Sequence, residues 1–228
     1  MQLKDQGKQD LSNTDRIRKV HHIRWLSENT YVVRFNRNGM EFKCGQFVSA
    51  AVLGSRQRRE YSIYSGEKDD YLEILIREII NGNLSVRLKF SETNDLIDVV
   101  GPFGFMSLNA EQIPSKKFIL VASGTGIAPF HSIVRTYPQL DYNLIHGVRY
   151  GEEAYEREDY NPERYFLCTS KDNKGDMKGR VTDYIRDIEV NKDMVFYLSG
   201  NGNMIYEVYH ILKNKGIPDD LVHAEVYF

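Results

Sequence analysis

The pattern of apolar and polar residues changes near the middle of the chain. Up to about residue 108, short β-like runs are separated by turn residues such as Asn, Gly and Asp. The predicted strands are Ile17–Trp25, Thr30–Phe35, Gln46–Val52, Arg59–Ser65, Tyr71–Arg77 and Leu96–Val99. Several short strands at this spacing predict an antiparallel barrel, which one helix at Leu84–Phe90 interrupts.

After residue 115 the apolar runs become continuous and alternate with helical stretches. Phe118–Ala122 is uniformly apolar, as expected of a parallel strand that is buried on both faces. Further strands are predicted at Leu144–Val148, Tyr165–Thr169, Val195–Leu198 and His223–Phe228, and helices from Pro129 to about Tyr137, at Val181–Ile188 and at Asn203–Lys215. This alternation predicts an open parallel sheet with helices on both faces.

The two patterns predict two domains with different sheets. We expect a polar tail at 1–13, an antiparallel Greek-key β-barrel at 14–108, a linker at 109–115 and a Rossmann-like α/β domain at 116–228.

Composition narrows the possible partners. The net charge of −2 gives no reason to expect nucleic acid or an anionic membrane as partner. No apolar run approaches the roughly 18 residues that span a bilayer, and residues 1–13 lack the apolar core of a signal peptide. The two cysteines, Cys44 and Cys168, are far apart and form neither a zinc site nor a disulfide framework. We expect a cytoplasmic monomer.

The segment Arg59–Ser65 carries a cation, an aromatic ring and a hydroxyl at nearby positions. Successive side chains of a strand point to opposite faces, so Arg59, Tyr61 and Ile63 share one face unless the chain bends. A cation near an aromatic plane suits a ligand with both an anion and a flat ring, and Ser62 could reach the ring edge. The alternative is an ordinary tyrosine-rich strand with a surface arginine.

Two glycine-containing segments precede predicted helices and are candidate phosphate sites. Gly82-Asn83-Leu84-Ser85 opens the first helix, where free amides attract a phosphate, although an ordinary glycine turn with a cap explains it too. Gly124-Thr125-Gly126 lies between a buried strand and a helix, and this context favours a pyrophosphate site.

Ligands of an open parallel sheet bind beyond the carboxyl ends of its strands. Hydroxyl and cationic side chains that suit the 2′-phosphate of NADP follow such ends, namely Arg149, Ser170, Lys171 and Arg180. Asp172 keeps open the alternative that a carboxylate binds the ribose of NAD. Near residue 200, Gly200 would let a nicotinamide ring approach the main chain.

Taken in order, these segments resemble the ferredoxin–NADP reductase family, in its bacterial-type branch. The matching features are Arg-x-Tyr-Ser at 59–62, Gly-x-x-Ser at 82–85, Gly-Pro-Phe-Gly at 101–104, the glycine loop at 124–126, the segment 199–205 and a terminal Glu-x-Tyr at 225–227. The resemblance covers about 16–228. Two departures are Ser199, where the family has cysteine, and Gly202, where it often has proline.

The resemblance implies an FAD site in the first domain and an NADP(H) site in the second. Tyr61 would stack on one face of the flavin, and Tyr227 or Phe228 would cover the other, with Tyr227 favoured. The residues implied in catalysis are Ser62, Ser199, Glu225 and Tyr227. The residues implied in binding FAD or NADP(H) are Arg59, Tyr61, Ser62, Ile63, Tyr64, Ile76, Gly82, Asn83, Leu84, Ser85, Gly124, Thr125, Gly126, Arg149, Ser170, Lys171, Arg180, Gly200, Asn201, Met204, Tyr227 and Phe228.

The implied function is an FAD-dependent oxidoreductase that passes electrons between NADPH and a separate carrier, ferredoxin or flavodoxin. The carrier is expected to be separate because this chain lacks the four cysteines of an iron–sulfur cluster. Arg56, Arg58 and Arg59 form a basic cluster suited to docking an acidic carrier. Two alternatives are a free-flavin reductase, which the terminal Tyr227-Phe228 disfavours, and a non-catalytic redox subunit, which Ser199 leaves open.

Overall fold

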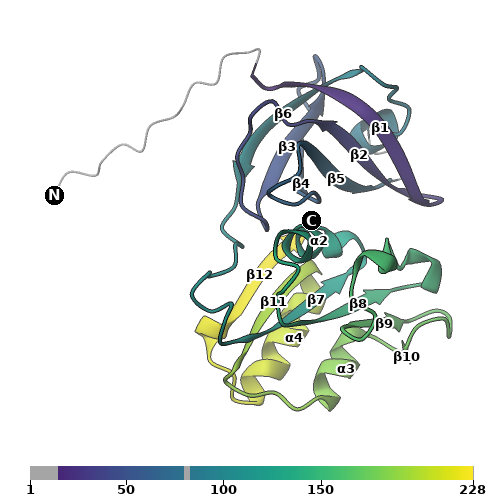
Figure 1. Ribbon diagram of the computed structural model, residues 1–228. Coiled ribbons are helices and arrows are strands. Elements are labelled where there is room, and N and C mark those ends of the chain that lie inside the picture. Colours follow the sequence, from purple (N-terminus) through teal and green to yellow (C-terminus); the bar gives the residue numbers. More distant parts are fainter. Residues whose placement is uncertain (1–14, 80–82, 228) are drawn as a thin grey trace.

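The computed structural model describes residues 15–79 and 83–227, and it gives the main chain alone at Asn83 and Tyr227. Two domains follow one another along the chain and lie against each other, with β12 reaching toward the first domain (Figure 1). The tail at 1–13, Gly82 and Phe228 lie outside the described residues.

The first domain is a six-stranded antiparallel sheet in the order β4-β3-β6-β1-β2-β5. Its elements are β1 (Ile17–Ser27), β2 (Thr30–Asn36), β3 (Phe47–Val52), β4 (Arg59–Ser62), β5 (Tyr71–Arg77), α1 (Asn83–Leu88) and β6 (Leu96–Phe103). The sheet curls until its two edges meet at a bridge between Ile63 and Ile74. Leu84 and Leu88 of α1 pack into the apolar core that the sheet encloses.

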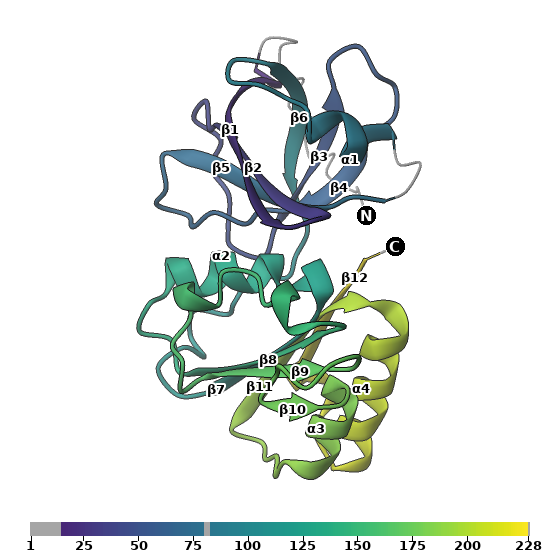
Figure 2. The ribbon, with the colours of Figure 1, turned by 90° about the vertical axis from the view of Figure 1, so that its right-hand side faces the viewer.

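The second domain is a six-stranded parallel sheet in the order β10-β9-β8-β7-β11-β12. Its strands are β7 (Lys117–Ser123), β8 (Tyr142–Val148), β9 (Tyr165–Thr169), β10 (Met177–Lys178), β11 (Met194–Asn201) and β12 (Val222–Tyr227). Helix α2 (Ala128–Thr136) covers the face toward the first domain, and α3 (Val181–Asp187) and α4 (Gly202–Asn214) cover the other (Figure 2). Short 3₁₀ turns are η1 (Gly124–Ile127), η2 (Gly151–Glu153), η3 (Arg157–Asp159) and η4 (Asp219–Leu221).

The strand order places a topological switch point between β7 and β11. From β7 the chain runs outward through β8, β9 and β10, and it then returns to place β11 on the other side of β7. The connections on the two sides of this point lead in opposite directions, which leaves a crevice at the carboxyl ends of the strands. The loop after β7 and the end of β11 form the walls of this crevice.

The two domains share apolar packing as well as a chain connection. Val32, Tyr64 and Leu75 of the first domain belong to the same cluster of buried residues as Phe130 of α2. Burial of apolar surface between the domains stabilises their docking. This cluster therefore spans the contact between the domains, and a second cluster fills the first domain itself.

The fold class expected from the sequence is confirmed, and the differences are local. β4 ends at Ser62, three residues before the expected end, because the chain turns there into the bridge with β5. β6 runs on to Phe103, and the two-residue β10 is too short to leave a pattern in the sequence. Within 15–79 and 83–227, no helix has the length and apolar character to cross a membrane.

Candidate active site

A cleft of about 460 Å³ lies where β4 of the first domain approaches β12 of the second. The Ser62 hydroxyl donates a hydrogen bond to Glu225 Oε2 across it, at 3.2 Å. The residues that line the cleft are Phe47, Ser49, Arg58, Arg59, Glu60, Ser62, Glu225 and Val226. Two residues that the sequence places 163 positions apart thus meet at one point.

Glu225 is the titratable group at the centre of this cleft. Burial raises the pKa of its carboxyl from 4.5 to about 7, the hydrogen bond from Ser62 opposes the rise, and the nearby Glu60 charge adds to it. Burial disfavours the charged form of a carboxyl, which is why its cost dominates here. A group that titrates near neutral pH can hold or release a proton under working conditions.

The predicted flavin strand presents some side chains and buries others. Arg59 is exposed, and Tyr61 is half-buried against the core of the first domain, where burial raises the pKa of its phenol to about 12. Ile63, Tyr64 and Ile76 are fully buried. Any contact between these three residues and a ligand would therefore come from the main chain.

The predicted phosphate site at α1 is described from Asn83 onward. Leu84 and Ser85 are buried, and the Ser85 hydroxyl accepts a hydrogen bond from the Ile79 amide at 3.2 Å. The Ser85 carbonyl accepts a hydrogen bond from the Tyr31 hydroxyl. Both contacts fix the start of α1 to neighbouring strands.

A second cavity, of about 550 Å³, lies at the switch point of the parallel sheet. Predicted nucleotide contacts from five segments at the strand ends line it, namely Gly124, Thr125, Gly126, Arg149, Ser170, Arg180, Gly200, Asn201 and Met204. Lys171 is exposed next to Ser170, and its amide donates to the Arg149 carbonyl at 2.9 Å. The cavity mixes cations with exposed main chain, which suits a phosphorylated ligand.

Glycines bring the two walls of this cavity together. A Cβ on Gly126 would lie 2.4 Å from the Ser199 carbonyl oxygen and 2.6 Å from the Gly200 Cα. Gly200 has a φ of +122°, and a Cβ there would lie 2.5 Å from Ser123 Oγ. Both positions therefore require glycine. A Cβ at either position would overlap atoms of the opposite wall, so the two glycines let the loop after β7 pack directly against the end of β11.

Ser199 precedes Gly200 on β11, at the contact between the two walls of the cavity. Its neighbours in register are Ala122 on β7 and Glu225 on β12, and residues in register on parallel strands face the same side of the sheet. Its hydroxyl is fully buried and has no hydrogen-bond partner within the described residues. A buried hydroxyl without a partner is costly, so a bound ligand that supplied one would be stabilised there.

Asp172, on which the alternative of an NAD site rested, forms hydrogen bonds with main-chain amides near it. Its carboxylate accepts hydrogen bonds from the Gly151 amide at 2.9 Å and the Lys174 amide at 3.1 Å. These main-chain bonds lower the pKa of the carboxyl. The carboxylate shapes its own loop rather than lining the cavity.

The sequence analysis missed His146 of β8. Its Nε2 donates to the Gly124 carbonyl at 2.9 Å, and its Nδ1 accepts from the Tyr165 hydroxyl at 2.7 Å. Burial lowers the pKa of His146 to about 4, so the ring is neutral at physiological pH. The imidazole of His146 within the largely apolar stretch Tyr142–Val148 was the feature of the sequence that could have pointed to it.

Arg77 and Glu153 were missed as well. Arg77, from the first domain, pairs with Glu153 of the second at 3.3 Å, and both line the cavity. Glu153 also accepts from the Arg149 amide at 2.8 Å. No local pattern in the sequence points to a pair between residues of different domains.

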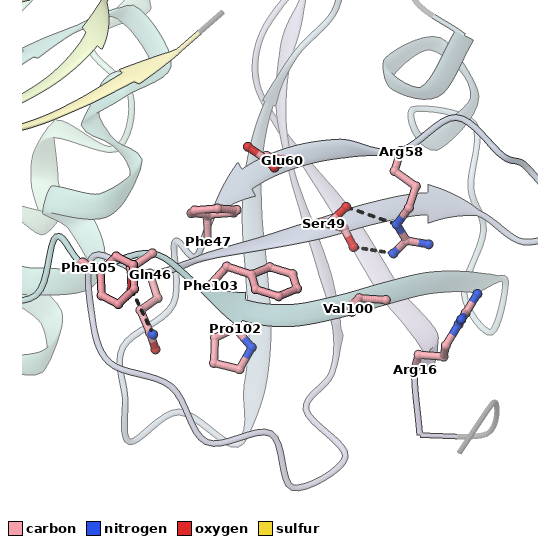
Figure 3. A pocket seen from close by; sticks show the side chains of 11 residues that line it. Arg16, Gln46, Phe47, Ser49, Arg58, Glu60, Val100, Pro102, Phe103 and Phe105 are labelled. Carbon is pink, nitrogen blue, oxygen red and sulfur yellow. Dashed lines mark hydrogen bonds between the residues drawn. The ribbon is translucent and has the colours of Figure 1, made fainter. Parts of the chain in front are cut away.

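An aromatic pocket of about 880 Å³ opens on the first domain beside the cleft and shares Phe47 and Glu60 with it (Figure 3). Phe103 and Phe105 line it, and the Phe105 side chain is fully exposed. The close-up shows these rings together with Phe47 around one hollow of the surface (Figure 3). We call this hollow the aromatic pocket.

Arg58 on the rim of the aromatic pocket is largely neutralised. It donates to the Ser49 hydroxyl at 3.1 Å and pairs with Asp98 at 3.0 Å. Arg16 pairs with the same carboxylate at 2.7 Å. Of the predicted basic cluster, Arg58 therefore serves the sheet itself, while Arg56 and Arg59 are exposed.

The cavity and the cleft lie at neighbouring strands, because Gly200 of β11 lines the cavity and Glu225 of β12, which is in register with Ser199, lines the cleft. This arrangement defines a class of two-domain protein that brings two cofactors together. Comparisons with known proteins agree. Residues 18–107 match the oxidoreductase FAD-binding domain family, and residues 120–210 match the oxidoreductase NAD-binding domain family. The chain belongs to the ferredoxin–NADP reductase family.

Individual relatives show the extent of the similarity. The toluate 1,2-dioxygenase electron transfer component of Pseudomonas putida is 30% identical over 87% of this chain and 63% of its own length. The ferredoxin–NADP reductase of Pseudomonas aeruginosa is 34% identical over 61% of this chain and 56% of its own length. The chain thus spans less than two thirds of either relative.

Solved structures share the fold. A ferredoxin NADP+ reductase from Neisseria gonorrhoeae superposes with a TM-score of 0.82 at 22% identity, over 93% of this chain and 98% of that one. The Amycolatopsis cytochrome P450 reductase GcoB gives a TM-score of 0.81 at 23% identity, over 92% of this chain and 68% of that one.

Proposed function

We propose that this chain is an FAD-dependent oxidoreductase that moves electrons between NADPH and a separate one-electron carrier, a ferredoxin or a flavodoxin. The contact between Ser62 and Glu225 carries the proposal, because it joins the predicted flavin strand to the edge of the nucleotide cavity. Relatives named ferredoxin–NADP reductase and electron transfer component support the same class.

The residues present fit both cofactors. Gly126 and Gly200 let the loop after β7 pack against the end of β11, and the buried Ser199 hydroxyl beside them has no partner within the described residues. Exposed Arg59 would pair with the flavin pyrophosphate, and Tyr61 would support the ring. Tyr227 would cover the other face. When bound, FAD would link two-electron exchange with nicotinamide to one-electron exchange with a carrier.

The chain itself would orient the reactants and manage a proton. The Ser62 hydroxyl would hydrogen-bond the flavin edge, and Glu225 would hold or release a proton beside the nicotinamide pocket. Closely packed glycines would exclude water and keep the rings near one another, which proximity-driven transfer requires.

NADPH is preferred over NADH in this proposal because of the charges around the cavity. Arg149 and Arg180 line it together with Ser170, and a 2′-phosphate that leaves water needs such partners. The Asp172 carboxylate, which would repel that phosphate, is held by the Gly151 and Lys174 amides.

The carrier would dock at the aromatic pocket. This pocket adjoins the cleft through shared residues, and exposed Phe103 and Phe105 offer apolar contact area without disturbing the core. Arg56 and Arg59 supply positive charge nearby for an acidic partner. Electrons would then cross a short distance from the cleft to the bound carrier.

The decisive experiment is a visible spectrum of desalted protein followed by anaerobic titration with NADPH. We expect yellow protein with one FAD per chain, bleached by one equivalent of NADPH and less readily by NADH. Colourless protein that reduces added flavin would favour a free-flavin reductase. Yellow protein that NADPH does not bleach, and that fails to reduce ferricyanide, would favour a non-catalytic redox subunit.

A further inference from the structure

One face of α2 docks on the segment that follows the flavin strand. Its residues are spaced as on one helix face, and each bonds to the stretch 64–69 of the first domain. The bonds are His131 Nδ1 to the Tyr64 carbonyl at 2.7 Å, Ser132 Oγ to the Ser65 carbonyl at 2.7 Å, Arg135 Nε to Asp69 at 2.6 Å and the Glu67 amide to Thr136 Oγ1 at 3.1 Å.

His131 is buried and contributes an aromatic ring to these contacts. Its ring stacks on the Tyr64 ring with centroids 3.7 Å apart and planes 7° from parallel. Its Nδ1 lies 2.7 Å from the Tyr64 carbonyl and its Nε2 lies 2.9 Å from Asp159 Oδ2. A carbonyl and a carboxylate only accept, so a ring nitrogen can hydrogen-bond either partner only as a donor.

Acidic and aromatic side chains surround the ring. The hydrogen bond between His131 and Asp159 lowers the pKa of the Asp159 carboxyl. Glu156 accepts from the Tyr64 hydroxyl at 2.8 Å and pairs with Arg24 of the first domain at 2.5 Å. Tyr160 meets the imidazole edge at 5.9 Å between centroids.

His131, Glu156 and Asp159 also have the spacing of a metal site. Each carboxylate already has a partner, however, because Glu156 pairs with Arg24 and Asp159 contacts His131 Nε2. The other ring nitrogen, Nδ1, bonds to the Tyr64 carbonyl. We therefore interpret the cluster as an interdomain contact between charged and aromatic groups. It stands on α2 and the η3 turn on one side and on β1 and residue 64 on the other.

We propose that the stacked His131–Tyr64 pair is the positioning contact that fixes the flavin strand relative to the nucleotide loop. Tyr64 lies two residues beyond Ser62, and α2 begins directly after the glycine turn η1. The pair thus joins the two reacting sites by a short, rigid path. The inference rests on the proposed function, because it concerns the same reaction.

The expected consequence is kinetic. Transfer between two bound rings needs reacting atoms about 3–3.5 Å apart, and a misplacement of about 1 Å can cost on the order of 100-fold in rate. Loss of the stack should therefore slow the transfer step while each cofactor, held mainly by its own domain, still binds.

The first test is the rate of flavin reduction by saturating NADPH in His131→Gln, measured by stopped-flow. We expect a fall of about 10-fold or more, with dissociation constants for FAD and NADPH within about 2-fold of wild type. Arg135→Ala is the matched control, because it removes an exposed interdomain ion pair on the same helix. Its rate should stay within about 2-fold.

Two results would overturn the proposal: an equal loss of rate in both variants, or a His131→Gln protein with an unchanged rate. If His131→Gln does not fold, Tyr64→Leu decides, since it removes the stacked ring and leaves His131 in place. A fall of about 10-fold in Tyr64→Leu supports the proposal if Tyr64→Phe, which keeps the stack and loses only the bond to Glu156, stays within about 2-fold of wild type. An unchanged rate in Tyr64→Leu counts against it.

A second readout needs neither cofactor nor turnover. Nitrogen-15 NMR of the apoprotein should show a hydrogen on His131 Nδ1, because the Tyr64 carbonyl only accepts, and an Nδ1 without a hydrogen would contradict the geometry on which the proposal stands. Wild-type protein that NADPH does not reduce would refute the proposed function instead, and the NMR result would still judge the interdomain contact.

Discussion

The nucleotide cavity and the flavin cleft are built by opposite means. The cavity belongs mainly to one domain, and its shape comes from main chain at Gly126 and Gly200, where no Cβ fits. The cleft belongs to two domains, and its central contact joins the side chains of Ser62 and Glu225. One sheet fixes the first, whereas domain docking fixes the second.

This difference predicts different sensitivities. Adding a single carbon to the cavity forces main chain apart, since protein interiors are close-packed. The cleft has more room for side-chain exchange, but it responds to charge and to protonation, because its carboxyl is buried and titrates near neutral pH. Steric variants should therefore act most strongly on nucleotide binding, and charge variants on flavin binding.

The largest effect is expected for Gly126→Ala. The new Cβ would press on the Ser199 carbonyl and the Gly200 Cα, which are main-chain atoms that cannot swing away. Overpacking typically costs about 1–3 kcal/mol, which corresponds to roughly 5- to 150-fold in NADPH affinity if the loop absorbs the strain. Isothermal titration with NADP+ measures the loss of affinity, and a thermal melt measures the loss of stability.

Gly202→Ala is the control for that variant. Its Cβ would meet only the Val226 side chain, at 3.3 Å, and the position opens α4. Stability and NADP+ affinity should stay close to wild type. Equal losses in the two variants would mean that the loop as a whole, rather than the contact between its walls, limits binding.

Arg59→Ala comes next and tests the cleft. A hydrogen bond to a charged group is worth about 1.5–3 kcal/mol, so loss of the pyrophosphate partner should weaken FAD binding by roughly 10- to 150-fold. The measurement is FAD fluorescence during dilution of the holoprotein. Arg56→Ala removes an exposed cation a few residues away and should leave FAD bound; similar losses in both would indicate a general charge effect.

The fold could be predicted from the sequence because each domain has its own pattern of apolar and polar residues. Continuous apolar runs such as Phe118–Leu120 mark strands buried on both faces, and glycines at 124 and 126 mark the loop that follows. Most residues predicted to contact the nucleotide line the cavity at the switch point, since they follow strands at fixed positions.

The rest could not be predicted, because it depends on which domain surfaces meet. His131 and Tyr64 look like ordinary core residues in the sequence, and only the docked domains reveal that they stack. The same holds for Arg77 with Glu153. The sequence placed Arg58 in a basic cluster that would dock a carrier. In the structure its side chain pairs instead with Asp98 of the same sheet.

A smaller effect is expected from the protonation of Glu225. Its folded-state pKa is about 7 against 4.5 ordinarily, so the folded apoprotein binds more protons than the unfolded chain between these values. This contribution to stability is fully present below pH 4.5 and is lost as pH rises through about 7. Thermal melts of the apoprotein from pH 5 to 8 should show the decline.

Glu225→Gln should flatten that part of the pH profile, because glutamine can still accept the Ser62 hydrogen bond and does not titrate. Glu60→Gln serves as comparison. It removes only the neighbouring charge that raises the pKa further, so the decline should persist and shift to lower pH. An identical profile in wild type and Glu225→Gln would show that another group titrates.

The smallest effect is expected for Phe105→Ser, and it separates the carrier from both cofactor sites. Phe105 is fully exposed and lines the aromatic pocket, so its loss should leave folding, FAD content and ferricyanide reduction unchanged. If a ferredoxin docks there, its KM should rise by roughly 3- to 10-fold, since an interface aromatic outside the most buried centre is worth about 1 kcal/mol. Tyr206→Ser removes another exposed aromatic, from α4 on the second domain, and is the matched control. A rise in KM for Tyr206→Ser alone would place the carrier on the nucleotide domain and make the cavity, rather than the cleft, the exit for electrons.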